Sequence, residues 1–81
     1  MSIFRISFRY QLATDPNSQG FDVVDITAPT WEQARADARQ FLKKVTRNST
    51  IRREQRPEIT KVDELIWDNK WGWDLLTRWT M

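Results

Sequence analysis

Apolar and polar residues alternate one for one near the start of the chain. The apolar positions of this segment are Phe4, Ile6, Phe8, Tyr10 and Leu12. A period of two with aromatic and branched side chains indicates a strand with one face on the core, while Arg5 and Arg9 point to solvent. Residues 14–20 then gather turn-forming residues and predict a surface loop. Residues 21–28 predict a second strand, which we expect to pair with the first as an antiparallel hairpin.

The second strand carries an irregular apolar pattern. Its apolar residues begin at odd positions, Phe21 and Val23, and continue at even positions, Val24, Ile26 and Ala28. A change of phase within one strand is typical of an inserted residue. We therefore predict a β-bulge near Val23 and Val24.

A helical pattern follows, from Thr30 to about Asn48. Thr30 with Gln33 three residues later matches a capping box, and Glu32 suits the positive end of a helix. One face carries apolar residues at helical spacing: Trp31, Ala34, Ala38, Phe41, Leu42 and Val45. The alanines predict close packing of this helix on the sheet.

The last third of the chain contains one ambiguous segment and one clear strand. Residues 58–67 fit a helix that begins at Pro57, but their β-branched content and the turn after them favour a strand. Residues 68–70 predict a turn, and alternation over residues 71–79 predicts the last strand. The sequence thus predicts an α+β fold, a small antiparallel sheet with one amphipathic helix packed on it, in the order β-β-α-β-β. We expect residues 1–81 to form a single compact domain.

The composition argues against catalysis. Cysteine and histidine are absent, which removes disulfides, thiolate and imidazole metal sites and the commonest nucleophile and base systems. Two glycines are too few for a glycine-rich phosphate loop. The carboxylates lack the spacing of a calcium loop and are interpreted as solvated surface charge. We predict that the protein is not an enzyme and has no metal or cofactor.

The sequence also bears on location. No apolar run approaches the ~18 residues that cross a membrane. Charges interrupt the apolar residues of the first segment, MSIFRISFRYQ, so we expect no signal peptide and a cytoplasmic protein.

Residues 67–79 hold four of the five tryptophans. We expect Trp71 and Trp73 to close the core together with Trp31, and we take Trp67 and Trp79 as candidates for exposure. Exposed tryptophan beside charged residues is typical of interaction hot spots. The candidate partner-binding residues are Trp67, Lys70, Asp74, Arg78 and Trp79.

A basic segment gives an alternative function. The net charge of +2 is distributed as −2 over residues 1–34, +6 over residues 35–56 and −2 over residues 57–81. Cations on one helix face and the following loop could track a phosphate backbone, or could simply be solvated. The alternative nucleic-acid-binding residues are Arg35, Arg39, Lys43, Arg47, Arg52 and Arg53.

Residues 3–46 are predicted to form a strand, a loop, a strand and a helix, and they include the stretch DVVDITAPTWEQARADARQFL. This architecture resembles that of small phage-encoded proteins of the anti-CRISPR type. The resemblance implies a non-catalytic inhibitor that binds a bacterial CRISPR effector complex in the host cytoplasm and blocks its DNA binding or nuclease recruitment. Many such inhibitors are acidic and imitate DNA. The net charge of +2 departs from that pattern, so a contact with a protein surface fits better. Both a monomer and a homodimer remain open.

Overall fold

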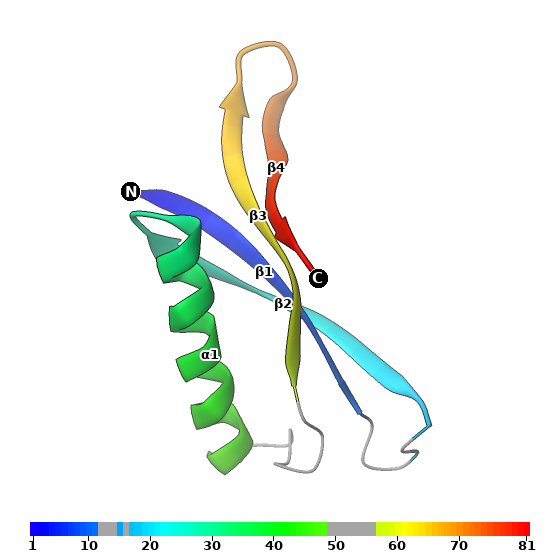
Figure 1. Cartoon of the computed structure of the whole chain (residues 1–81). Helices are drawn as coiled ribbons and strands as arrows, with labels where there is room; N and C mark the ends of the chain where they lie inside the picture. The colour runs from blue at the N-terminus through cyan, green and yellow to red at the C-terminus, as the bar shows by residue number, and fades with distance from the viewer. Residues whose placement is uncertain (12–14, 16, 49–56) are drawn as a thin grey trace.

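Four strands and one helix make up the described part of the chain, and they confirm the predicted order (Figure 1). The computed structural model describes residues 1–11, 15, 17–48 and 57–81, without the side chains of 45–48. The elements are β1 (Ser2–Gln11), β2 (Gln19–Ala28), α1 (Trp31–Asn48), β3 (Glu58–Asp68) and β4 (Gly72–Thr80). All strand pairs are antiparallel, and the order across the sheet is β2-β1-β3-β4. Residues 58–67 thus form a strand, as favoured.

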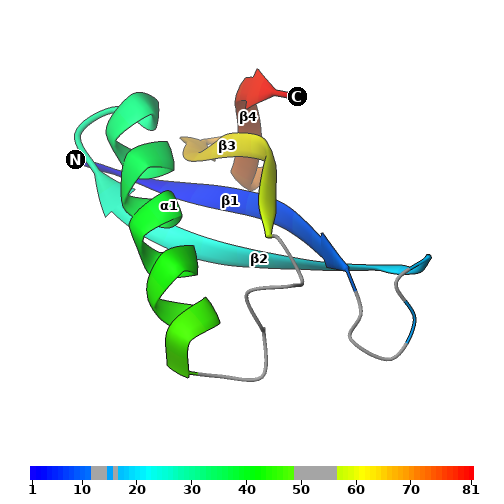
Figure 2. The same cartoon turned by 60° about the horizontal axis from the view of Figure 1, so that its bottom comes forward.

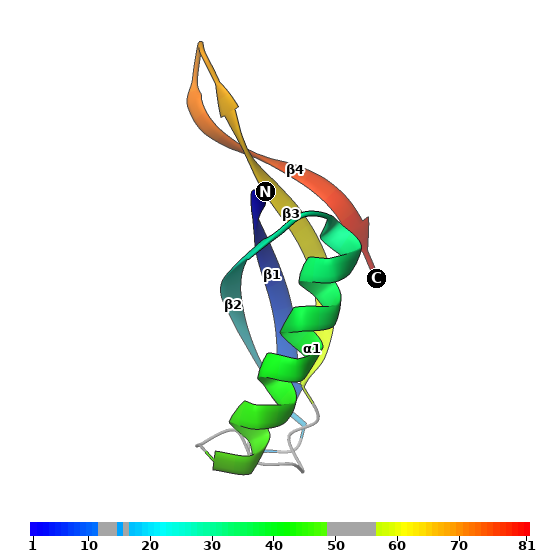
Figure 3. The same ribbon diagram turned by 90° about the vertical axis from the view of Figure 1, so that its left-hand side faces the viewer.

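Helix α1 covers one face of this sheet (Figures 2 and 3). Ala34 and Ala38 are fully buried, which lets the helix backbone approach the sheet closely. The buried apolar core consists of Phe4, Ile6, Phe8, Ala28, Ala34, Ala38, Leu42, Ile59 and Val62. It therefore takes its side chains from the even positions of β1, from the end of β2, from β3 and from one helix face.

The start of α1 has the predicted N-cap. The backbone N–H of Gln33 donates to the Thr30 hydroxyl at 3.2 Å, and the N–H of Ala34 donates to the Thr30 carbonyl at 3.1 Å. The Gln33 side chain donates to Asp37 at 2.8 Å, one turn further along the helix, instead of bonding back to Thr30 as the predicted capping box requires. Thr30 therefore satisfies one of the N–H groups that a helix start leaves unpaired.

The predicted bulge near Val23 and Val24 is wrong. Strands β1 and β2 pair without a shift from Ser2↔Ala28 to Gln11↔Gln19. Phe21 and Val23 instead lie on the face of the sheet opposite α1, where 70% and 51% of their surfaces are exposed. The change of phase in the sequence reflects a strand with apolar residues on both faces.

Two register shifts occur elsewhere in the sheet. One lies between Ser7 and Phe8 where β1 pairs with β3, and the other lies between Val62 and Asp63 where β3 pairs with β4. Bulges of this kind strengthen twist. The β3–β4 hairpin rises past the first turn of α1 and forms one end of a molecule that measures 44 × 22 × 20 Å (Figure 3).

Replacement of Thr30 tests how much the helix N-cap contributes to stability. We expect Thr30→Ala to lower the free energy of unfolding by about 1 kcal/mol, because an N–H at the helix start loses its acceptor. Thr30→Ser keeps the hydroxyl and is the matched control. Urea denaturation followed by circular dichroism measures both variants. Equal stabilities for the Ala and Ser variants would show that the cap contributes nothing.

Candidate functional site

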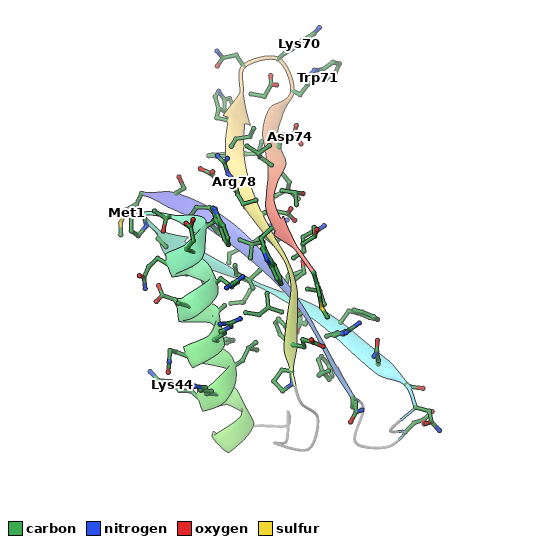
Figure 4. All side chains as sticks on the ribbon, in the orientation of Figure 1. Met1, Lys44, Lys70, Trp71, Asp74 and Arg78 are labelled. Atoms are coloured by element: carbon green, nitrogen blue, oxygen red, sulfur yellow. The ribbon has the colours of Figure 1, made fainter. Side chains whose placement is uncertain are left out.

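Three tryptophans gather at the outer end of the β3–β4 hairpin. Trp67, Trp71 and Trp73 are 61%, 76% and 64% exposed. We call this surface the tryptophan tip, and define it as Trp67, Asn69, Lys70, Trp71 and Trp73. In Figure 4 Lys70 and Trp71 mark the outermost turn of the hairpin. This is the largest concentration of exposed aromatic surface among the described residues.

Contacts within the tryptophan tip fix its side chains. Trp67 and Trp73 are cross-strand partners, and their rings meet edge to face with centroids 5.4 Å apart. The indole N–H of Trp67 donates to Asn69 Oδ1 at 3.0 Å. The Lys70 ammonium lies 5.4 Å from the centre of the Trp71 ring, within the range of a cation–π contact.

The turn beneath the rings is set by Asp68 and Gly72. Asp68 Oδ1 accepts the backbone N–H groups of Lys70 at 2.7 Å and of Trp71 at 3.2 Å. This carboxylate closes the turn in the manner of an Asx motif. Gly72 has a φ of +83°, a backbone conformation that residues other than glycine rarely adopt. Asp68 and Gly72 therefore define the turn from which the rings of the tip project.

The predicted distribution of the tryptophans was wrong in three positions. Trp71 and Trp73 are exposed instead of buried, because Trp73 pairs with Trp67 on the face of the hairpin that points away from α1 and Trp71 lies in the turn between β3 and β4. Trp79 is half-buried against the core instead of exposed, and the Arg35 guanidinium lies 4.9 Å from its ring centre. Trp67 is exposed, as predicted.

The reversal of Trp79 has its cause in the register shift. Trp79 pairs with Val62 but Thr77 pairs with Asp63, so Arg78 is the extra residue of β4. One extra residue moves every later side chain to the other face of a strand. Simple alternation along β4 would place Trp79 on the same face as Trp73. Because of the extra residue, Trp79 instead lies on the face that packs against α1, beside the buried Val62.

The five candidate partner-binding residues divide into two groups along the hairpin. Trp67 and Lys70 belong to the tryptophan tip, and Asp74 lies close to it on β4 (Figure 4). Arg78 and Trp79 lie at the base. There Arg78 donates to Glu64 Oε1 through Nη2 at 2.7 Å and through Nε at 2.9 Å.

Glu64 joins the start of β1 to the base of the hairpin. The pKa of the Glu64 carboxyl lies below its ordinary value. The main cause is a hydrogen bond from the Ser2 side chain, and the second is the hydrogen bond from Arg78. The Glu64 side chain is 17% exposed, whereas the Arg78 side chain is 42% exposed, so this ion pair lies at the surface. The cluster holds the base of the hairpin against the rest of the sheet.

The alternative nucleic-acid residues are only partly within the described structure. Arg35 lies over the rings of Trp31 and Trp79, at 5.7 Å and 4.9 Å. Arg39 and Lys43 are exposed on α1. The side chain of Arg47 and residues Arg52 and Arg53 lie outside the described residues.

Sequence reasoning missed the apolar residues on the sheet face opposite α1. Ile3, Phe21, Val23 and Leu75 are exposed. The signal was present in the sequence, because Ile3 occupies the polar phase of β1, and Phe21 and Val23 occupy the polar phase of β2. It was interpreted as an irregularity of the backbone.

No family model, curated protein or solved structure matches this chain. Within the described residues no helix is long and apolar enough to span a membrane. The same residues contain no group of three or more acidic side chains placed to hold a metal ion.

The Glu64 cluster makes stability depend on pH. A carboxyl whose pKa is lower in the folded state contributes stability above its unfolded pKa of about 4.3, and this is lost as the pH falls through the folded pKa. We expect Glu64→Gln to reduce the fall in unfolding free energy between about pH 5 and pH 2. Ser2→Ala, which removes the hydrogen bond that lowers the Glu64 pKa most, should lie between this variant and the wild type. Denaturation curves at a series of pH values measure the slopes, and parallel slopes for wild type and Glu64→Gln would contradict the assignment.

Proposed function

We propose that this chain is a non-catalytic protein-binding module whose contact surface is the tryptophan tip. The observation that supports this most strongly is the exposure of three tryptophans at the end of an ordered hairpin. Each tryptophan can bury about 150–250 Å², and burial of apolar surface stabilises a complex by about 25 cal/mol per Å² before opposing terms. Tryptophan is also the side chain most enriched at interaction hot spots.

The order of the tip favours tight binding. Immobilising a free side chain at an interface costs roughly 0.5–1.5 kcal/mol. Trp67 is already held by Trp73 and Asn69, and Trp71 is already in contact with Lys70. Much of this ordering cost therefore falls on folding instead of on association.

Local charge supports a protein partner over a phosphate backbone. Residues 67–74 carry one cation, Lys70, and two carboxylates, Asp68 and Asp74. A surface with a single cation offers little of the phosphate neutralisation from which the affinity for DNA or RNA largely comes. A narrow hairpin also suits a concave site, into which the exposed rings can insert.

The resemblance to anti-CRISPR proteins supplies a candidate for the partner. In this proposal the protein is a stoichiometric inhibitor of a bacterial CRISPR effector complex, and the tip occupies a groove that target DNA or a recruited nuclease would use. The role requires a rigid shape and a strong contact surface, and it requires no catalytic group.

Single alanine substitutions in the tip test the proposal. We expect Trp71→Ala or Trp73→Ala to weaken binding to the effector complex by roughly 30-fold, the effect of losing a hot spot worth about 2 kcal/mol. Phe41→Ala removes an exposed aromatic ring from α1 and is the matched control. Interferometry with immobilised effector measures affinity, and a plasmid-interference assay in a CRISPR-bearing bacterium measures inhibition. Full inhibition by the folded tip variants would refute the proposed surface.

A DNA titration separates the alternative function. We expect weak binding of wild-type protein to single- or double-stranded DNA at physiological salt. Tight binding that falls steeply with salt, and that Arg39→Gln weakens while Trp71→Ala does not, would transfer the function to the basic helix face.

A further inference from the structure

One face of the β3–β4 hairpin stays apolar below the tryptophan tip. Two neighbouring cross-strand pairs, Trp67↔Trp73 and Leu65↔Leu75, lie on the face that points away from α1. We call these four residues the apolar strip. Trp67, Trp73 and Leu75 are 61%, 64% and 42% exposed, and Leu65 is half-buried. The strip therefore continues the tip along the strands by two residues, or about 7 Å.

The opposite face of the same hairpin has a different chemistry. The register places three carboxylates on it, Glu64, Asp68 and Asp74. Leu76 lies among them and is 40% exposed, almost the same fraction as its neighbour Leu75. The two faces of the hairpin thus differ in charge and not in the exposure of their leucines.

The apolar strip ends at a carboxylate that the chain itself satisfies. Asp63 is the next residue of this face along β3, and it is only 2% exposed, which corrects its interpretation as a solvated charge. It accepts the Thr77 hydroxyl at 2.7 Å and pairs with the Lys61 ammonium at 3.3 Å. A ligand on the strip therefore meets no unpaired charge from Asp63 at this end.

The strip presents a hydrogen-bond donor but no acceptor. None of its four side chains carries a charge or a hydrogen-bond acceptor. The indole N–H of Trp67 donates to Asn69 Oδ1, whereas the indole N–H of Trp73 donates to no described residue. Because a buried indole N–H needs an acceptor, a ligand that covers the strip must be apolar and must supply an oxygen atom.

Three classes of ligand fit this surface poorly. Sugar hydroxyls need acceptors as well as donors, and the side chains of the strip offer none. Nucleic-acid phosphates and anionic lipid surfaces need cations. Residues 67–74 carry only one, Lys70, against the carboxylates of Asp68 and Asp74. A peptide segment with apolar side chains and unpaired carbonyl groups fits better.

We propose that the apolar strip binds a proline-rich segment of the protein partner in the polyproline II conformation. Proline has an apolar ring and no backbone N–H, so it needs no acceptor from the strip. The carbonyl groups of a polyproline II helix are not used within the helix, and one of them accepts the Trp73 indole N–H. Aromatic surfaces are the usual docking sites of such segments.

The geometry of the strip suits this occupant. The rings of Trp67 and Trp73 meet at 75°, so they form a corner against which a proline ring packs. One turn of polyproline II has three residues and is about 9 Å long, which is close to the length of the strip. This inference rests on the proposed function, because it takes the tip as the contact surface and names the chemistry of the segment that the tip contacts.

Isothermal titration calorimetry with a decaproline peptide tests the proposal on the full chain. We expect saturable binding to the wild-type protein, and none of a glycine–serine peptide of the same length. Leu75→Asp should weaken decaproline binding by roughly tenfold or more, because it places a charge within the apolar contact. Leu76→Asp is the matched control and should change the affinity by less than about twofold, since it puts the same charge on the other face of the same strand.

A second variant separates the hydrogen bond from the apolar contact. Trp73→Phe keeps an aromatic ring and removes the indole N–H. We expect it to weaken decaproline binding by roughly fivefold, the effect of one lost hydrogen bond. Circular dichroism shows whether each variant is folded, so that a loss of binding is not confused with a loss of the hairpin.

Three results would overturn the proposal. They are wild-type protein that does not bind decaproline, equal affinities for folded Leu75→Asp and Leu76→Asp, and binding to vesicles of neutral phosphatidylcholine without binding to decaproline. The last result would assign the strip to a lipid surface.

The proposal and the proposed function fail separately. If decaproline does not bind but Trp73→Ala still loses binding to the effector complex, the tip remains the contact surface and the partner segment is not proline-rich. If decaproline binds through Leu75 but the folded tip variants inhibit fully, the peptide site stands and the proposed inhibitor surface does not.

Discussion

One helix shorter than the sheet it covers determines the form of this molecule. Helix α1 has 18 residues and spans about 27 Å, whereas the 11 residues of β3 span about 36 Å. Ala34 and Ala38 bring the helix close to the sheet, and the core of the described residues consists of nine buried apolar residues, three on α1 and six on the strands. A helix of this length leaves the end of the β3–β4 hairpin uncovered, and the surface proposed for binding follows from this mismatch.

Local periodicity was sufficient to predict the elements and their order. Alternation in β1, the helical spacing from Trp31 to Leu42 and the turn at residues 68–70 all corresponded to observed structure. The choice of a strand for residues 58–67 was also correct. Its reason is tertiary, because β3 pairs on both sides and carries the buried Val62 and Ile59.

Periodicity could not locate the bulges, and for this reason the predicted exposure of Trp79 was wrong. The extra residue Arg78 depends on how β4 pairs with β3, which is a property of two segments together. A strand's own sequence cannot show it, so Trp79 was assigned to the wrong face. In β2 a bulge was predicted where none exists, because the exposed apolar residues Phe21 and Val23 gave the sequence the pattern of a register shift. The exposure of Trp73 depends on which face of the hairpin α1 covers, and that of Trp71 on its place in the turn, and neither can be predicted from the sequence of β4 alone.

The separation of the tryptophan tip from the core has a consequence for the evolution of this protein. A small domain has a stability of only about 5–15 kcal/mol, so most changes to its core are removed by selection. Trp67, Trp71 and Trp73 contribute little to that core, and substitutions at such exposed positions usually change stability by less than about 0.5 kcal/mol. The sequence of the tip can therefore change quickly, while the helix and the sheet beneath it stay the same.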